Sequence, residues 1–307
     1  MGRPSAIRPI LLREARRRPR LEVRDLAKLV LQNEFGGGHL VIDEAGSRER
    51  LLAEIRDSAS AGSVPGPRPP RFESIGNGYC RLHLAGIDGT GLSPETVHRM
   101  FLVSSEPAPD RAPGSRAGFD AKIRVLRRCL EEGVLPFPPA ELDRVLSDLE
   151  AAGWPFLGHS AAYREAYAPA YRVVRSCFRD LLPVFRRIDT ALAGGGTLRV
   201  AIDGPCGSGK STLAAILRRV YGCSVLPMDH FFLPPALRTP GRLAEPGGNL
   251  DTDRLLAEVA PGLLEGHPVT YRPFDCRIMA PGRPVTLRPH RLLVLEGSYS
   301  LHPKLRD

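Results

Sequence analysis

The pattern that most constrains the fold is a short apolar run, residues 198–202, that leads directly into the octapeptide Gly-Pro-Cys-Gly-Ser-Gly-Lys-Ser at 204–211. A brief apolar run bounded by glycines is typical of a buried parallel strand, and the apolar stretch at 212–221 is typical of a helix. The octapeptide fits G-x-x-x-x-G-K-[ST] in full, in the strand–loop–helix context that this motif requires. We therefore predict a parallel α/β unit built around this loop.

The residue types of the octapeptide predict what the loop binds. Glycines allow successive backbone N–H groups to turn inward around phosphate oxygens, and the helix N-terminus adds partial positive charge. Lys210 would neutralise charge on the β- and γ-phosphates, and Ser211 would offer its hydroxyl to Mg²⁺. We predict ATP and Mg²⁺ as ligands, against the alternative of a glycine turn without a ligand. The expected nucleotide-binding residues are Gly204, Pro205, Cys206, Gly207, Ser208, Gly209, Lys210, Ser211 and Thr212.

Two carboxylates follow later apolar runs. The run at 223–228 ends in Asp229, and the run at 292–295 ends in Glu296. A carboxylate at a strand end beside the loop is suited to take a proton from a substrate hydroxyl, so Asp229 is the expected catalytic base beside Lys210; the alternative is a helix cap or loop acid. The second run is similar to a Walker B strand, whose carboxylate reaches Mg²⁺ directly or through water. We expect Ser211 and Glu296 to hold the metal.

Five segments resemble the uridine kinase and phosphoribulokinase family in sequence and in order: 204–212, 228–232, 249–251, 271–277 and 295–297. The resemblance spans about residues 197–307. It implies ATP-dependent phosphotransfer to a hydroxyl of a small molecule, a nucleoside or related acceptor. It also implies Asp229 as the base and contacts from Asp251, Tyr271 and Arg277 to the acceptor.

The chain departs from that family in ways that leave alternatives open. Residues 248–252 read Gly-Asn-Leu-Asp-Thr where F-D-H-P is common, and 271–277 lacks the histidine often found before the arginine, so the nucleobase is not predicted. The chain ends at Asp307, which predicts three parallel strands, an exposed apolar edge on the first strand, and no arginine lid or adenine-binding segment. An ATP-binding regulatory module and a truncated, catalytically impaired remnant are therefore the rival interpretations.

The first 193 residues are expected to form a mostly helical α+β domain of unknown role, preceding a P-loop NTPase-like three-layer domain at 194–307 with an incomplete parallel sheet. Apolar spacing predicts helices at 21–33, 48–57, 93–101, 119–132 and 139–152 and a strand at 78–85. A longer helical stretch at 160–192 should be split by Pro169 and Pro183. Tyr163, Tyr167 and Tyr171 would share one of its faces, as core or as a ligand wall.

Composition narrows the class of protein further. Nearly all positive side chains are arginines. The basic run at 13–20 has no interleaved aromatic residues, which favours a solvated arm, or an anchor for the acidic face of a partner, over nucleic-acid binding. The six cysteines show no zinc-ligand spacing, so reduced thiols are expected; for Cys206, at a helix start, an oxidation-prone thiol is the less favoured alternative. Without a long apolar stretch or a signal peptide, the expected location is the cytoplasm, with no membrane partner. The oligomeric state is not predicted.

Overall fold

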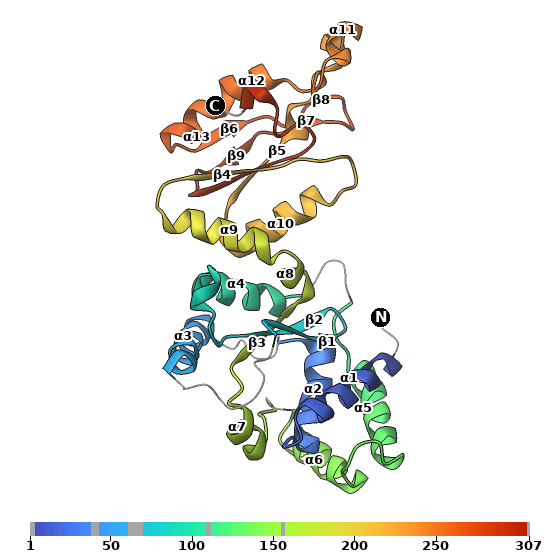
Figure 1. The fold of residues 1–307 in the computed structure, drawn as a ribbon. Coiled ribbons are helices and arrows are strands. Elements are labelled where there is room, and N and C mark those ends of the chain that lie inside the picture. The colour runs from blue at the N-terminus through green and yellow to red at the C-terminus, as the bar shows by residue number, and fades with distance from the viewer. Residues whose placement is uncertain (1–3, 38–42, 61–69, 108–111, 155–156, 306–307) are drawn as a thin grey trace. The chain divides into compact units, whose positions relative to one another are not determined.

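The computed structural model describes residues 4–37, 43–60, 70–107, 112–154 and 157–305, and it divides the chain into two compact units, Met1–Arg187 and Ile188–Asp307 (Figure 1). The division falls within α9 (Leu182–Ala193), shortly before the boundary expected at residue 194. We describe each unit by itself.

The N-terminal unit is built on an antiparallel sheet of order β1-β2-β3. Figure 1 shows helices on both of its faces, with α1, α2, α5 and α6 below it and α4 above, and α4 in turn contacts α3. The apolar positions of α2 that the sequence predicted, Leu26, Leu29 and Val30, are fully buried. The elements are η1 (Pro4–Ile7), α1 (Arg8–Arg17), α2 (Val23–Phe35), α3 (Glu44–Ser60), β1 (Phe72–Gly76), β2 (Tyr79–His83), η3 (Asp88–Thr90), α4 (Pro94–Ser105), α5 (Arg116–Glu131), α6 (Pro139–Ala151), α7 (Ala161–Tyr167), β3 (Tyr171–Arg175) and α8 (Ser176–Asp180).

The predicted long helix at 160–192 is wrong in its middle. α7 ends at Tyr167, Ala168 takes a left-handed φ of 39°, and the chain then forms β3, which pairs with β2 along its whole length. Pro169 removes a helical N–H, and Val173 and Val174 suit a strand, so sheet pairing overrides the helical spacing. Tyr171 therefore lies on a strand and not on the helix of Tyr163 and Tyr167.

The basic run at 13–20 is not a solvated arm. Most of it belongs to α1, and Arg13 donates to the backbone carbonyl of Ser74. Arg18 donates to Glu14 at 2.6 Å and to Glu73 at 2.9 Å, and both carboxylates are buried. The helix forms because its apolar side chains, including the fully buried Leu11, pack into the core; Arg13 and Arg18 pack beside it, whereas Arg16, Arg17 and Arg20 remain exposed.

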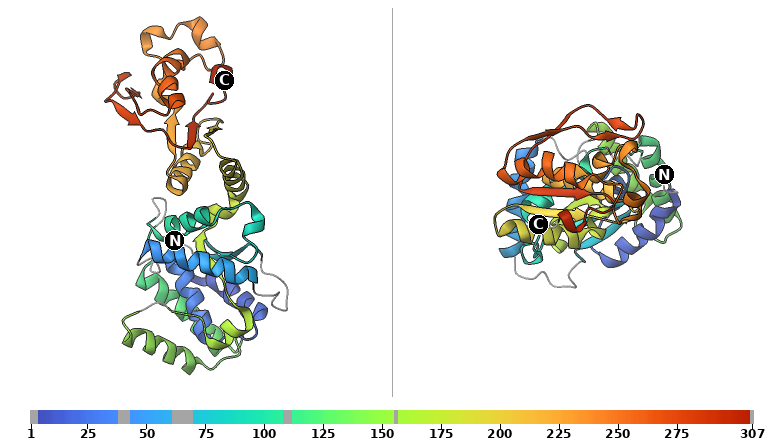
Figure 2. Two further views of the ribbon diagram at one scale, coloured as in Figure 1. Left: turned by 90° about the vertical axis from the view of Figure 1, so that its left-hand side faces the viewer. Right: turned by 90° about the horizontal axis from the view of Figure 1, so that it is seen from above.

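The C-terminal unit contains the predicted three parallel strands, in the order β4-β10-β5. Figures 1 and 2 show α9 and α10 on one face and α12 and α13 on the other. Within the described residues, β4 (Leu198–Ile202) pairs with β10 alone and is an edge strand. Its residues are half-buried or exposed, so the prediction of a buried strand is wrong and that of an exposed edge agrees with the structure. The other elements of the core layers are α10 (Lys210–Tyr221), β5 (Ser224–Pro227), α12 (Thr252–Glu258), α13 (Ala260–Glu265) and β10 (Leu292–Glu296).

Short elements complete this unit around the carboxyl ends of β5 and β10. They are η4 (Met228–Phe231), η5 (Pro235–Leu237), α11 (Pro240–Ala244), η6 (Pro303–Leu305) and two antiparallel pairs, β6 (Val269–Tyr271) with β9 (Val285–Leu287) and β7 (Phe274–Asp275) with β8 (Ala280–Pro281). Met228, Phe231 and Tyr271 are buried together in one apolar cluster, which anchors η4 directly after β5. In the described part of the chain, no helix is both long and apolar enough to cross a membrane.

Candidate phosphate-binding site

The glycine loop lies between the end of β4 and the start of α10, as the motif predicts. Gly204, Gly207 and Gly209 take φ values of 147°, 76° and 85°, a region that other residues adopt only with strain. α10 begins at Lys210 and runs for 12 residues. The first backbone N–H groups of a helix have no carbonyl partner within the helix, so this end of α10 presents unpaired donors toward the loop.

The cation of the motif is held by the loop itself. The Lys210 ammonium donates to the backbone carbonyl of Pro205 at 2.8 Å, within the same turn of chain. The loop is further closed by the Ser208 N–H, which also donates to Pro205 at 3.3 Å. Cys206 is a free thiol exposed on this loop, and nothing in the structure tests the alternative that it oxidises readily.

Ser211 and Glu296 are brought together as the sequence predicts. The Ser211 hydroxyl lies 3.1 Å from one carboxylate oxygen of Glu296 and 3.2 Å from the other. Glu296 is the last residue of β10, which pairs in parallel with β4, so the two carboxyl ends meet beside the loop. This contact joins residues that lie 85 positions apart.

Asp203 is a site residue that the sequence analysis missed. Its carboxylate accepts three backbone N–H groups: Gly204 at 2.7 Å, Tyr299 at 3.0 Å and Leu301 at 3.1 Å. The Ser298 hydroxyl donates to the Gly204 carbonyl in the same region. These bonds tie the glycine loop to the segment after Glu296. The available signal was the position of Asp203, an acid between a predicted strand and the first glycine.

Asp229 lies on η4, immediately after β5, and its side chain is exposed. Its neighbour His230 contacts one of the residues expected near the acceptor, Tyr271. The His230 Nδ1 atom lies 2.9 Å from the Tyr271 hydroxyl. Burial lowers the pKa of His230, while the nearby carboxylates of Asp229 and Glu296 oppose that shift. His230 was part of the quoted segment but had no assigned role; its place directly after the proposed base was the signal.

Tyr271 is buried under this cluster. Its ring stacks on Phe231 with centroids 5.1 Å apart, and burial raises the pKa of its hydroxyl to about 12. Tyr271 therefore stays protonated near neutral pH. Because burial keeps the imidazole of His230 neutral, we assign the Tyr271 O–H as the donor and His230 Nδ1 as the acceptor.

Asp251 and Arg277, the other residues expected near the acceptor, already have partners. Asp251 caps α12, since its carboxylate accepts the Arg254 N–H at 3.0 Å. Arg277 lies beyond β7 and forms a bond of 2.8 Å with Asp275, which lowers the pKa of that carboxyl to about 2. The side chain of Arg277 is 88% exposed. β7 does pack against η4, so the Arg277 segment begins beside the Asp229 segment.

At the carboxyl ends of β5 and β10, Ser211 pairs with Glu296, and His230 contacts Tyr271 and feels the charges of Asp229 and Glu296. The site combines a loop of backbone donors, an ammonium group, and a hydroxyl paired with a carboxylate. Such a set is suited to binding a polyphosphate and a hard divalent cation. Among the described residues, no three His, Cys, Asp or Glu side chains gather as a metal cage, which is compatible with Mg²⁺, since that ion uses few protein carboxylates and takes its other ligands from phosphates and water.

Comparison with models of known protein families finds no match, and comparison with curated proteins finds none either. Among solved structures, the chain is similar to one described as a possible uridine kinase from Bacillus stearothermophilus. The sequence identity is 22% and the TM-score 0.37, and the match covers 42% of this chain and 76% of that chain. A likeness of this size carries no inference about substrate or activity, which therefore rests on the site.

Proposed function

We propose that the C-terminal unit binds Mg-ATP and transfers a phosphoryl group to a hydroxyl of a small molecule, in the manner of the uridine kinase-like enzymes that its segments resemble. The observation that carries the proposal is the pairing of the Ser211 hydroxyl with Glu296 at 3.1 Å, directly beside Lys210 in the glycine loop. A glycine turn without a ligand would have no reason to bring together a hydroxyl and a carboxylate from distant segments.

The residues present fit a magnesium ion. Hydroxyl and carboxylate oxygens are hard ligands, and two of them from the protein leave positions for phosphate oxygens and water. Ser211 and Glu296 would hold the ion, which when bound supplies positive charge between the β- and γ-phosphates.

The chain's own residues have separable roles in this proposal. Lys210 and the N–H groups at the start of α10 bind and orient the phosphates. Asp229, exposed on η4 directly after β5, accepts the proton of the acceptor hydroxyl. Asp251 is a weaker candidate for the base, because its carboxylate is engaged at the start of α12.

The acceptor side of the proposal rests on Tyr271 and Arg277, with Asp251 as a positioning residue. Tyr271 would act through His230, whose imidazole it holds, and Arg277 would exchange Asp275 for an anionic or polar group of the acceptor. An exposed ion pair of this kind contributes little to stability, so breaking the Arg277–Asp275 pair to bind the acceptor costs little free energy.

The test is an ATP-consumption screen over nucleosides, pantothenate-like acceptors and sugar phosphates, with and without Mg²⁺. Lys210→Ala is the blank. Asp229→Asn should lower kcat by about a hundredfold or more while leaving the calorimetric affinity for Mg-ATP within about twofold, because the amide cannot take the proton. Asp253→Asn, at an exposed carboxylate of the same unit paired with Lys304, is the matched control.

Two outcomes would count against the proposal. If transfer survives Asp229→Asn unchanged, the assigned base is wrong. If the folded protein binds Mg-ATP tightly yet phosphorylates no acceptor, the regulatory-module interpretation replaces the kinase; if it gives no heat with Mg-nucleotides, both fail.

A further inference from the structure

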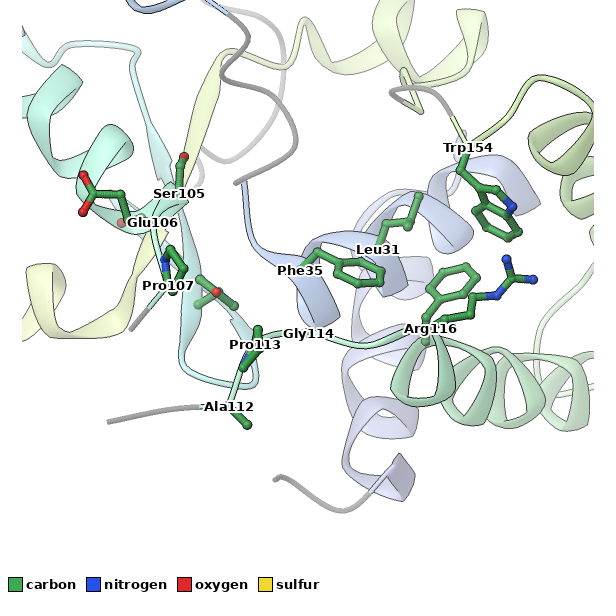
Figure 3. Close-up of a pocket in the computed structure, with 13 residues that line it drawn as sticks. Leu31, Phe35, Ser105, Glu106, Pro107, Ala112, Pro113, Gly114, Arg116 and Trp154 are labelled. Carbon is green, nitrogen blue, oxygen red and sulfur yellow. The ribbon is translucent and has the colours of Figure 1, made fainter. Parts of the chain in front are cut away.

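A cavity of about 480 Å³ lies in the N-terminal unit, apart from the glycine loop. It is bordered by the C-terminal part of α2, the end of α4, the start of α5 and Trp154 beyond α6 (Figure 3). Its volume is within the range of pockets that hold small organic ligands. Nothing in the proposed phosphotransfer uses it.

The wall of this pocket is a row of aromatic side chains. The Phe35 and Phe119 rings lie 6.3 Å apart, and Phe119 meets Trp154 edge-to-face at 5.5 Å. Phe119 is buried at the base, while Phe35 and Trp154 are half-buried and line the cavity. Pro107 and Pro113 form the side opposite Trp154 (Figure 3). A ring-shaped apolar group would find aromatic faces and edges here.

Close backbone packing fixes this wall. A Cβ added at Gly36 would lie 2.6 Å from the ring of Tyr79, and one added at Gly114 would lie 2.7 Å from the ring of Phe35. Real side-chain carbons do not approach so closely, so glycine at both positions lets the backbone press against the two rings. Phe35 and Tyr79, both on the lining of the pocket, are therefore held in place before any ligand arrives, which lowers the cost of binding.

The polar side chains that line the pocket differ in whether they can still form hydrogen bonds to a ligand. The hydroxyl of Ser104 donates to the Met100 carbonyl, and that of Ser105 donates to the Phe101 carbonyl, so both are used within α4. Arg116 differs. Its guanidinium carbon lies 3.9 Å from the Trp154 ring centroid, and its Nε donates to Asp120 at 2.8 Å in an exposed pair.

The two terminal nitrogens of Arg116 donate to no group in the described part of the chain. Glu106, the acidic residue on the lining, lies at the opposite end of the pocket from Arg116 (Figure 3). The pocket thus offers an apolar aromatic body and one cation with unused planar donors, the geometry that suits a carboxylate or sulfonate.

We propose that this pocket binds a small amphipathic organic anion, an aromatic body carrying one carboxylate or sulfonate, with the rings against Phe35 and Trp154 and the anionic group on Arg116. Binding would be independent of the glycine loop. The ligand's charge replaces water at the guanidinium, and its body removes aromatic surface from solvent.

The chain carries its own reporter, because Trp154 is its one tryptophan. The full-length protein is titrated with anilinonaphthalene sulfonate, and energy transfer from Trp154 to the bound probe is measured. The neutral N-phenylnaphthylamine, which has the same ring system without the sulfonate, is titrated in parallel. We expect saturable transfer with the anionic probe at one site per chain, and binding of the neutral probe that is weaker by about tenfold.

Variants separate the cation from the apolar wall. Arg116→Gln should weaken binding of the anionic probe by about tenfold and leave the neutral probe unchanged. Arg116→Lys should recover part of the loss, because it restores charge without the planar fork. Arg127→Gln removes a similarly paired arginine from the same helix and should change neither probe. Because Arg116 contacts the Trp154 ring, folding of each variant is judged by an unaltered far-UV circular dichroism spectrum and urea-unfolding midpoint, and energy transfer is normalised to the Trp154 emission of the same variant without probe.

The proposal is overturned if Trp154 shows no transfer to either probe, if the neutral probe binds as tightly as the anionic one, or if Arg116→Gln and Arg127→Gln behave alike. Each of these results would leave an apolar cavity without anion recognition.

Discussion

The two units of this chain use charge in opposite ways. In the N-terminal unit, Arg81 is fully buried and contacts Glu14 at 2.6 Å and Glu73 at 3.6 Å. In the C-terminal unit, Asp229 and Ser211 of the candidate site are exposed, and ion pairs such as Arg277–Asp275 stand in solvent. Buried charges must be paired to be tolerated, whereas exposed charges remain available to a ligand.

The buried network of the N-terminal unit extends to its titratable side chains. His159 Nδ1 lies 2.7 Å from Asp25, and its Nε2 lies 2.6 Å from the Tyr171 hydroxyl. Burial would raise the pKa of Asp25, but hydrogen bonds from His159 and Ser160 outweigh it and lower the pKa. These groups complete one another's hydrogen bonds, so their chemistry maintains the fold of this unit. The difference teaches that a cluster of ionisable residues can act as a binding site only where its side chains keep hydrogen-bond donors or acceptors that the protein itself does not use.

The largest expected effect breaks the buried network. Arg81→Met should destabilise the N-terminal unit by about 3–5 kcal/mol, because two buried carboxylates lose their central cation. The measurement is urea unfolding followed by Trp154 fluorescence, which reports this unit. Arg48→Met, which removes an exposed pair with Glu95, is the control and should cost less than about 1 kcal/mol. Equal losses in the two variants would show that the burial of Arg81 has no energetic role.

The next effect is a pH dependence of the same unit. Burial lowers the pKa of His159 to about 4. Between the unfolded value near 6.5 and that folded value, the unfolded chain binds the proton and the folded chain does not, so stability falls as the pH falls. From pH 7 to pH 4 the share due to His159 should be roughly 2–3 kcal/mol. His98, whose pKa burial also lowers, acts in the same direction. His159→Gln should therefore flatten the profile without abolishing its slope; an unchanged profile would contradict the assignment.

The smallest effect concerns an exposed pair in the other unit. Arg277→Gln should leave the unfolding temperature of the C-terminal unit essentially unchanged, since its pair with Asp275 stands in solvent. Calorimetric unfolding of the full chain measures this. If the same variant raises the KM for an acceptor, Arg277 contacts substrate, and the contrast between structural and available charge is sharpened. A loss of stability comparable to that of Arg81→Met would remove the contrast.

The sequence predicted the C-terminal unit better than the N-terminal one, for a physical reason. Local patterns predicted the glycine loop, the three parallel strands and the contact between Ser211 and Glu296. Each strand is a short apolar run, and parallel strands place the residues that follow them at the same edge of the sheet. In the N-terminal unit, β1 was missed and β3 was predicted as helix, because their pairing with β2 is a contact between distant segments that periodicity does not encode.

Hydrogen-bond partners were the least predictable part of the site. The carboxylate of Asp203 accepts N–H groups from residues almost a hundred positions away, and His230 acquires its importance from Tyr271 on another strand. Tyr163 illustrates the same limit in the N-terminal unit. Its ring stacks on His159 at 4.0 Å in the core, which confirms the core alternative for that residue, but its spacing alone did not distinguish this from a ligand wall.

Because the Lys210 ammonium donates to the Pro205 carbonyl, a phosphate arriving at the loop must displace a backbone dipole from that cation. The net binding free energy from Lys210 is the difference between its interaction with the ligand and its interaction with the Pro205 carbonyl. This difference would be large for a polyanion and near zero for an uncharged ligand. If the loop binds phosphate as proposed, this internal bond would favour strongly anionic ligands over uncharged ones.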